Sequence, residues 1–160
     1  QDVDSKLKQY NNVLLMSKLS DKEIKGTGSI NLEIPDQSGK VVSLNSLNGK
    51  VVLINFWASS NQASREANQR LKAVYNQYHS RGFEVYSVSL DNNKSAWMDA
   101  VRFEEYSWID VCELTFPNSY AASVYNIQNL PATFLLDREG NIVAKNISGR
   151  NLGTWLDNLL

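Results

Sequence analysis

The run KVVLINFW, residues 50–57, constrains the fold more than any other part of the chain. Its apolar residues are almost uninterrupted, which is typical of a central strand covered on both faces of a sheet. The next apolar run, residues 83–90, predicts a second strand. Between the two runs lies a polar turn, and then a helix whose expected apolar stripe consists of Ala63, Ala67, Leu71, Val74 and Tyr78. This order predicts a β-α-β unit.

The remaining elements extend this unit on both sides. A helix over 93–108 is expected to be capped by Asp91 or Asn93. The other expected elements are a hairpin of strands 30–34 and 40–44, a small strand 109–114, a helix 118–127, a hairpin of strands 131–137 and 142–147, and a terminal helix carrying Leu152, Trp155, Leu156 and Leu159. Strands alternating with helices predict an α/β fold with a mixed central sheet flanked by helices.

Two segments are expected within the 160 residues. Residues 1–25 predict an N-terminal helix and a polar, glycine-bearing connector, because Val3, Leu7, Tyr10 and Leu14 recur at helical spacing. Residues 26–160 predict one domain. It contains an N-terminal β-hairpin and an α-β insertion before the strand that begins at Pro131.

Composition excludes several classes of function. The chain has 16 basic and 17 acidic residues and a net charge of −1, so no nucleic-acid partner is expected. No apolar run is long enough to predict a transmembrane segment. The single cysteine, Cys112, cannot form an intrachain disulfide or a dithiol redox pair. With one histidine, His79, no metal site is expected, and no motif predicts a cofactor.

Four blocks, in order and at the right intervals, carry a family resemblance: NGKVVLINFWASS, RGFEVYSVSLD, SAWMDAV and LPATFLLDREGNIV. Together they resemble the thioredoxin-like thiol–disulfide oxidoreductases of the TlpA/ResA type, which are relatives of the AhpC/TSA group. The resemblance implies a thioredoxin-like fold. It also implies a location in the periplasm or at the cell envelope.

The resemblance does not extend to the two cysteine positions that carry the chemistry of the family. The family pattern reads F-W-A-S-W-C-P-P-C-R-x-E, whereas this chain has Ser60 at the second tryptophan and Asn61 at the first cysteine. Ser64 stands at the second cysteine. In the family, the first thiolate attacks a partner disulfide and the second cysteine resolves the mixed disulfide. Asn61 and Ser64 can do neither, and Asn55 replaces the buried acid of thioredoxin proper.

The altered turn allows two interpretations. Ser59, Ser60 and Asn61 all suit a helix N-cap, and Ser59 with Gln62 has the spacing of a capping box. Alternatively, the amide groups at this helix start still bind an anion or a peptide group. Ser64 is not expected to act as a hydrolase nucleophile, because no base of the catalytic-triad type is evident.

The resemblance implies a cis peptide bond before Pro131 and a groove in which an extended partner pairs with the backbone at Leu130 and Pro131. Trp57 and Ser60 are expected at the rim of this groove. The alternative is that Pro131 only shapes the start of its strand.

Two functional hypotheses remain open. In the first, the domain is redox-inactive and binds a protein or an extended peptide. In the second, it is an oxidoreductase that uses Cys112 as a lone thiol, which requires an exposed Cys112 with a lowered pKa. The alternating sequence around Cys112 instead favours a small buried hydrophobic residue.

Overall fold

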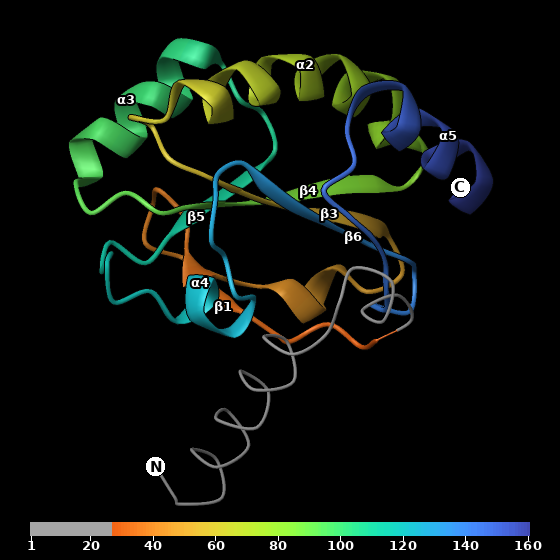
Figure 1. Ribbon diagram of the computed structural model, residues 1–160, viewed down its shortest axis with the longest axis horizontal. Helices are drawn as coiled ribbons and strands as arrows, with labels where there is room; N and C mark the ends of the chain where they lie inside the picture. The colour runs from red at the N-terminus through yellow and green to blue at the C-terminus, as the bar shows by residue number, and fades with distance from the viewer. Residues whose placement is uncertain (1–26) are drawn as a thin grey trace, which may run out of the picture.

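A computed structural model describes residues 27–160 (Figure 1). The predicted N-terminal helix lies outside the described residues. The main sheet has five strands in the order β5-β4-β3-β6-β7. These are β3 (Val51–Trp57), β4 (Phe83–Ser89), β5 (Ile109–Cys112), β6 (Ala132–Leu136) and β7 (Ile142–Lys145). The predicted mixed sheet is confirmed, because β3, β4 and β5 are parallel, β6 is antiparallel to β3, and β7 is antiparallel to β6.

Helices cover one face of this sheet (Figure 1). They are α2 (Gln62–Tyr78), α3 (Lys94–Glu104) and α5 (Gly149–Leu159). The described residues also contain two short 3-10 helices, at Leu44–Leu47 and His79–Arg81.

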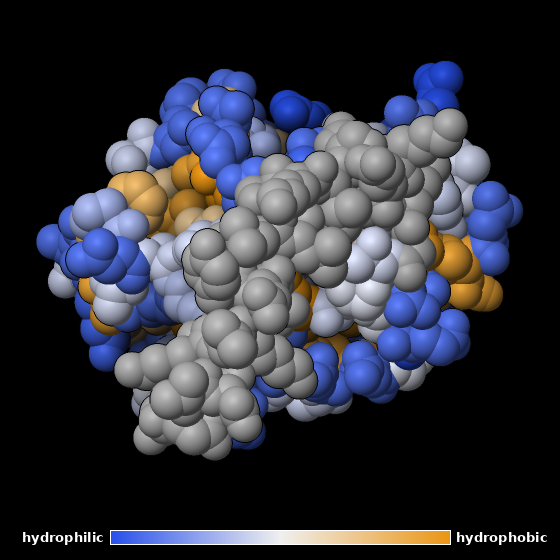
Figure 2. All heavy atoms as spheres, turned by 60° about the horizontal axis from the view of Figure 1, so that its bottom comes forward, coloured by the Kyte–Doolittle hydropathy of each residue, from blue (hydrophilic) through white to orange (hydrophobic). Residues whose placement is uncertain are grey.

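The opposite face carries α4 (Tyr120–Val124) and a small two-stranded sheet, β1 (Glu33–Pro35) with β2 (Val41–Ser43). This hairpin is the predicted one. Tyr125 fixes the segment that enters it, because its hydroxyl donates to Ile30 O at 2.5 Å and accepts from Ile30 N at 2.9 Å. Figure 2 shows hydrophobic patches framed by hydrophilic residues on the coloured part of this side.

The core is divided into two layers by the sheet. All seven residues of β3 are buried, as expected for a central strand. Because side chains alternate along a strand, Ile54 and Phe56 join the layer under α4 and the hairpin, whereas Leu53 and Trp57 join the layer under α2, α3 and α5.

The buried stripe of α2 differs from the expected one. Its buried residues are Ser64, Asn68, Leu71, Tyr75 and Tyr78. Ala63 is exposed, and Ala67 and Val74 are only half-buried. The helix is therefore rotated so that its first two turns present polar side chains to the sheet. The sheet residues beneath these turns, Asn55 of β3 and Ser87 of β4, are also polar and buried. A rule that counts only apolar residues misses such a face.

Candidate functional site

The polar turn joins the carboxyl end of β3 to the start of α2. Asn61 is the N-cap of α2, and its Oδ1 accepts a hydrogen bond of 2.7 Å from Ser64 N. The expectation of an N-cap in this turn is confirmed, but the proposed capping box of Ser59 and Gln62 is wrong. Gln62 donates instead to Glu66 at 3.1 Å. Likewise, α3 is capped by Asn93, one of the two predicted candidates.

Ser59 is held by Asp91, which follows β4 at the same edge of the sheet. The Ser59 hydroxyl donates to Asp91 Oδ1 at 2.6 Å, and Ser59 N donates to Asp91 Oδ2 at 3.1 Å. The Ser89 hydroxyl donates to the same carboxylate at 2.5 Å. A carboxylate that accepts several hydrogen bonds fixes the turn firmly. Asp91 is therefore a positioning residue that leaves Ser60 and Asn61 facing outward.

A pocket of about 300 Å³ opens at this turn. Three of its lining residues, Ser60, Asn61 and Leu130, are site residues expected from the sequence. Phe116, with 44% of its surface exposed, lies on the same pocket. The remaining lining residues are Ala58, Leu90, Asp91 and Asn92. The pocket thus combines an apolar wall with a polar helix start.

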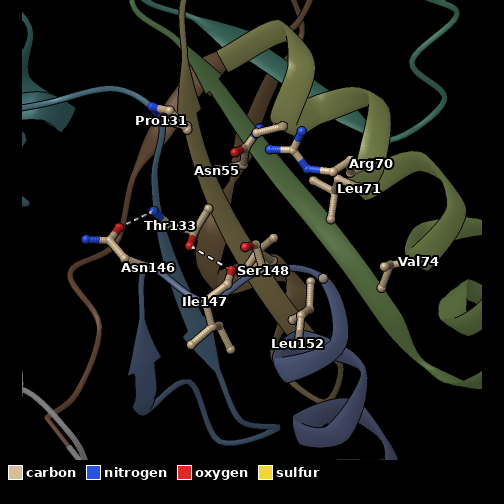
Figure 3. A pocket seen from close by; sticks show the side chains of 13 residues that line it. Asn55, Arg70, Leu71, Val74, Pro131, Thr133, Asn146, Ile147, Ser148 and Leu152 are labelled. Atoms are coloured by element: carbon tan, nitrogen blue, oxygen red, sulfur yellow. Dashed lines mark hydrogen bonds between the residues drawn. The ribbon is translucent and has the colours of Figure 1, made fainter. Parts of the chain in front are cut away.

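The Leu130–Pro131 peptide bond is cis, and so is Phe116–Pro117. Leu130 and Pro131 do not share one pocket. Pro131 lines a second, neighbouring cavity of about 150 Å³ between α2, β6 and the start of α5. Figure 3 shows Leu71, Val74 and Leu152 on the apolar side of this cavity and Arg70 reaching over it toward Asn55. The two pockets flank Leu130 and Pro131.

Trp57 is not at the rim of either pocket. Its exposed fraction is 0%, and its ring packs edge-on against Tyr106 at 5.4 Å between centroids. The expectation that Trp57 lines a groove is therefore wrong. The alternation of β3 points it into the layer under α2 and α3, although it is the last residue before the turn.

Asn61 and Ser64 occupy different environments. Asn61 is partly exposed at the pocket, whereas Ser64 is fully buried one turn inside the helix. The Ser64 hydroxyl makes no hydrogen bond to another described residue. The two residues that stand at the expected cysteine positions thus differ in exposure, and they carry an amide and a hydroxyl.

Cys112 is buried, with 2% of its surface exposed. Its Sγ donates to Asp91 O at 3.2 Å. Burial raises the pKa of the Cys112 thiol, which disfavours the reactive thiolate. The lone-thiol hypothesis required exposure and a lowered pKa, and the structure shows the opposite on both counts.

The sequence interpretation missed Asp91 as a site residue and Phe116 altogether. Asp91 carried a usable signal, because the carboxyl ends of parallel strands meet at one edge of a sheet, where sites in α/β folds form. Phe116 carried none, since it lies in an irregular segment after β5. Within the described residues, no group of three or more His, Cys, Asp or Glu side chains is arranged to hold a metal.

This five-stranded mixed sheet, with α2 starting just after its central strand and β6 antiparallel to that strand, defines a thioredoxin-like protein. The sequence profile of the AhpC/TSA family matches residues 26–145. The chain belongs to the AhpC/TSA family, and within it to the TlpA/ResA type of thiol–disulfide oxidoreductase sequences.

Relatives and solved structures agree with this placement. The thiol-disulfide oxidoreductase ResA of Bacillus cereus is 27% identical over 125 residues, covering 75% of this chain and 68% of that protein. ResA of Bacillus subtilis is 26% identical, covering 74% of this chain and 64% of its own length.

Among solved structures, a thiol-disulfide oxidoreductase from Bacteroides fragilis is 32% identical with a TM-score of 0.78, covering 84% of this chain and all 100% of its own. The C-terminal domain of a putative thiol-disulfide oxidoreductase from Bacteroides thetaiotaomicron is 30% identical with a TM-score of 0.78, covering 84% of this chain and 95% of its own. Among residues 27–160, no helix is both long enough and apolar enough to cross a membrane.

Proposed function

We propose that this domain is redox-inactive and binds an extended segment of a partner protein at the pocket formed by Ser60, Asn61, Phe116 and Leu130. One observation carries the proposal. The frame of a thiol–disulfide oxidoreductase site is intact around two positions that hold no sulfur, while the one thiol of the chain is buried beneath it.

The pocket is suited to binding without chemistry. Thioredoxin-like domains place an extended partner against the backbone beside the cis proline, and backbone pairing needs no thiol. The exposed ring of Phe116 and the side chain of Leu130 offer apolar contact, while Asn61 offers polar contact. The firm anchoring of the turn by Asp91 means that little order has to be gained on binding.

The redox half of the proposal is tested by insulin disulfide reduction with dithiothreitol. The wild-type domain is expected to leave the rate at its uncatalysed value. The double variant Asn61→Cys with Ser64→Cys places one thiol at the helix start and one inside the first turn, and is expected to accelerate reduction. Acceleration by the wild-type domain would refute redox inactivity.

The binding half is tested with displayed random peptides selected on the wild-type domain. Selected peptides are expected to bind Phe116→Ala and Leu130→Ala at least about tenfold more weakly, since each change removes an apolar side chain that lines the pocket. Phe103→Ala is the matched control, because Phe103 is 78% exposed on α3 and does not line the pocket. Undiminished binding to both pocket variants would refute the groove.

The location outside the cytoplasm, in a periplasm or at a cell envelope, is part of the same proposal. It is supported by the family resemblance of the chain. Cell fractionation with an antibody to this domain tests it.

A further inference from the structure

A row of polar side chains crosses the sheet beneath α2. Asn55 on β3 lies opposite Thr133 on β6 and Ser87 on β4, and Ser87 lies opposite Asp110 on β5. Asn55 Nδ2 donates to Ser87 Oγ at 3.1 Å and to Asn68 Oδ1 of α2 at 2.8 Å. Residues in register share a face, so these side chains all enter the layer under the helices. The row begins at the cavity of Figure 3, which Thr133 and Asn55 line, and ends at Asp110.

Six buried side-chain atoms of the described residues make no hydrogen bond: Trp57 Nε1, Ser64 Oγ, Asn68 Nδ2, Tyr106 Oη, Trp108 Nε1 and Asp110 Oδ2. Four of them belong to Asp110 at the end of this row and to the side chains that interact with it, Trp57, Trp108 and Tyr106. Buried polar atoms are normally paired, and isolated exceptions are scattered. A cluster of them around one carboxyl group indicates a site with more than one hydrogen-bonding arrangement.

Asp110 is the ionisable group at the centre of this cluster. Its exposed fraction is 2%, and Oδ1 accepts a hydrogen bond of 2.6 Å from Trp97 Nε1. The indole N–H groups of Trp57 and Trp108 lie beside the same carboxyl without forming a hydrogen bond of good geometry. Burial raises the pKa of Asp110 to about 8, against the opposing effect of these indoles and of Ser87.

The two protonation states of Asp110 need different surroundings. An indole N–H only donates, so three indoles suit a carboxylate, which only accepts. A protonated carboxyl instead has an O–H that needs an acceptor, and no indole supplies one. Ser87 Oγ is the acceptor in reach on the neighbouring strand. A proton on Oδ2 can therefore be donated to Ser87 Oγ while Oδ1 keeps the hydrogen bond of Trp97, and the indoles of Trp57 and Trp108 then face an O–H in place of an acceptor.

The strongest influences on the Asp110 carboxyl are its burial and the neutral donors Trp97, Trp108, Ser87 and Trp57. The Cys112 thiol on its own strand and Tyr106 between α3 and β5 interact electrostatically with Asp110, and Asp91 after β4 interacts with the same thiol. Beyond Tyr106 lie Arg65 and Glu104, which pair with each other at 3.6 Å.

We infer that Asp110 is a buried pH-sensitive switch that takes up a proton as the pH falls and thereby changes how Trp57 is held beneath the candidate site. Trp57 transmits the change because it is the last residue of β3, and its carbonyl accepts from Leu90 N at 2.8 Å in the wall of the pocket. Nothing in the proposed binding function requires this switch, and its test uses no partner.

The sign of the effect on stability follows from proton binding. The pKa of Asp110 in the folded state lies above that of an unfolded chain, about 3.9. Between these values the folded state holds a proton that the unfolded state releases. The stabilisation is complete below the unfolded pKa and is lost as the pH rises toward 8. Within that window the unfolding equilibrium constant is expected to rise by up to about tenfold per pH unit.

The experiment is urea unfolding between pH 5 and 9 of the wild type, Asp110→Asn and the control Glu104→Gln. The free energy of unfolding of the wild type is expected to fall as the pH rises, and Asp110→Asn is expected to flatten this fall. Glu104→Gln removes a neighbouring, less enclosed carboxylate and is expected to leave the fall unchanged. The difference between the wild-type and Asp110→Asn profiles removes the pH dependence that both proteins share. Parallel profiles for all three proteins would overturn the switch.

A direct measurement covers the case in which Asp110→Asn does not fold. In wild-type protein labelled with ¹³C at aspartate, the Asp110 carboxyl resonance is expected to titrate near neutral pH together with the Trp57 indole N–H resonance. A carboxyl resonance that stays constant from pH 5 to 9 would overturn the inference. So would a titration that leaves the Trp57 resonance unmoved.

Discussion

At the scale of single residues, the site is distinguished by the different environments of Asn61 and Ser64. Asn61, which caps α2, is partly exposed, whereas Ser64, in the first turn of that helix, is buried. Cys112 lies close by, but its side chain points into the core beside Asp91. Position in the fold, rather than the presence of a thiol, decides whether sulfur chemistry is available.

The Cys112 thiol is expected to be almost unreactive toward a chromogenic disulfide reagent in the folded domain. Reaction requires an opening that costs at least about 3 kcal/mol, so the native rate should be on the order of a hundredfold or more below the rate in denaturant. Stopped-flow absorbance at neutral pH, with and without urea, measures both rates. Comparable rates in the two conditions would show an accessible thiol and restore the lone-thiol hypothesis.

At the scale of secondary-structure elements, α2 shows how a substituted motif can still serve the fold. Its N-terminal amide groups need a partner, and Asn61 supplies one through its bond to Ser64 N. The same replacement that removes the attacking thiol therefore installs a good helix cap. The neighbouring Ser59 is left free to bind Asp91 and hold the turn.

Replacing the cap should destabilise the domain measurably. Asn61→Ala is expected to lower the free energy of unfolding by about 1 kcal/mol, because Ser64 N then loses its side-chain acceptor. Asn61→Asp is the control, since its carboxylate can accept the same bond and interacts favourably with the helix dipole. Urea unfolding monitored by circular dichroism measures both. Equal stability of Asn61→Ala and wild type would contradict the capping role.

At the scale of the whole molecule, the sheet separates two apolar layers that are each closed by different elements. Phe134 lies in the layer under α4 and the hairpin, where it packs against Tyr125 at 5.1 Å between ring centroids. Tyr125 in turn bonds the backbone of Ile30. Within this layer, Tyr125 at the end of α4 therefore connects the entry segment at Ile30 to β6 at Phe134.

Phe134→Ala is expected to lower the free energy of unfolding by about 3–5 kcal/mol, because it leaves a cavity in this layer. Phe103→Ala is a chemically matched control at an exposed position, with an expected change within about 0.5 kcal/mol. Thermal and urea unfolding of both variants measure the contrast. A small effect of Phe134→Ala would mean that the layer repacks or contributes little to cooperativity.

Sequence patterns sufficed for the order and type of the elements in residues 27–160. The continuous apolar run at 51–57 predicted a central strand, and all seven of its residues are buried. The terminal helix was predicted from its leucine spacing, and Leu152 and Leu156 are the buried ones. These features depend on the local periodicity of apolar residues, which can be recognised in the sequence without knowledge of the tertiary contacts.

The identity of the site residues depended on more than periodicity. Four in-order blocks, including the stretch around Asn61 and Ser64, placed the turn and the family correctly. They could not place Trp57, because the direction of the last strand residue depends on which face α2 covers. They could not place Phe116 either, since an irregular segment has no periodic signal.

By itself, the sequence determined that these 160 residues contain no cysteine pair, because they hold a single cysteine. It also determined the family and the strand–turn–helix frame. Only the tertiary structure decided that Cys112 is enclosed, that Asp91 anchors the turn, and that Asp110 stands among three indoles. The physical reason is that burial and hydrogen bonding join residues from different strands and helices, whose mutual distances no local pattern encodes.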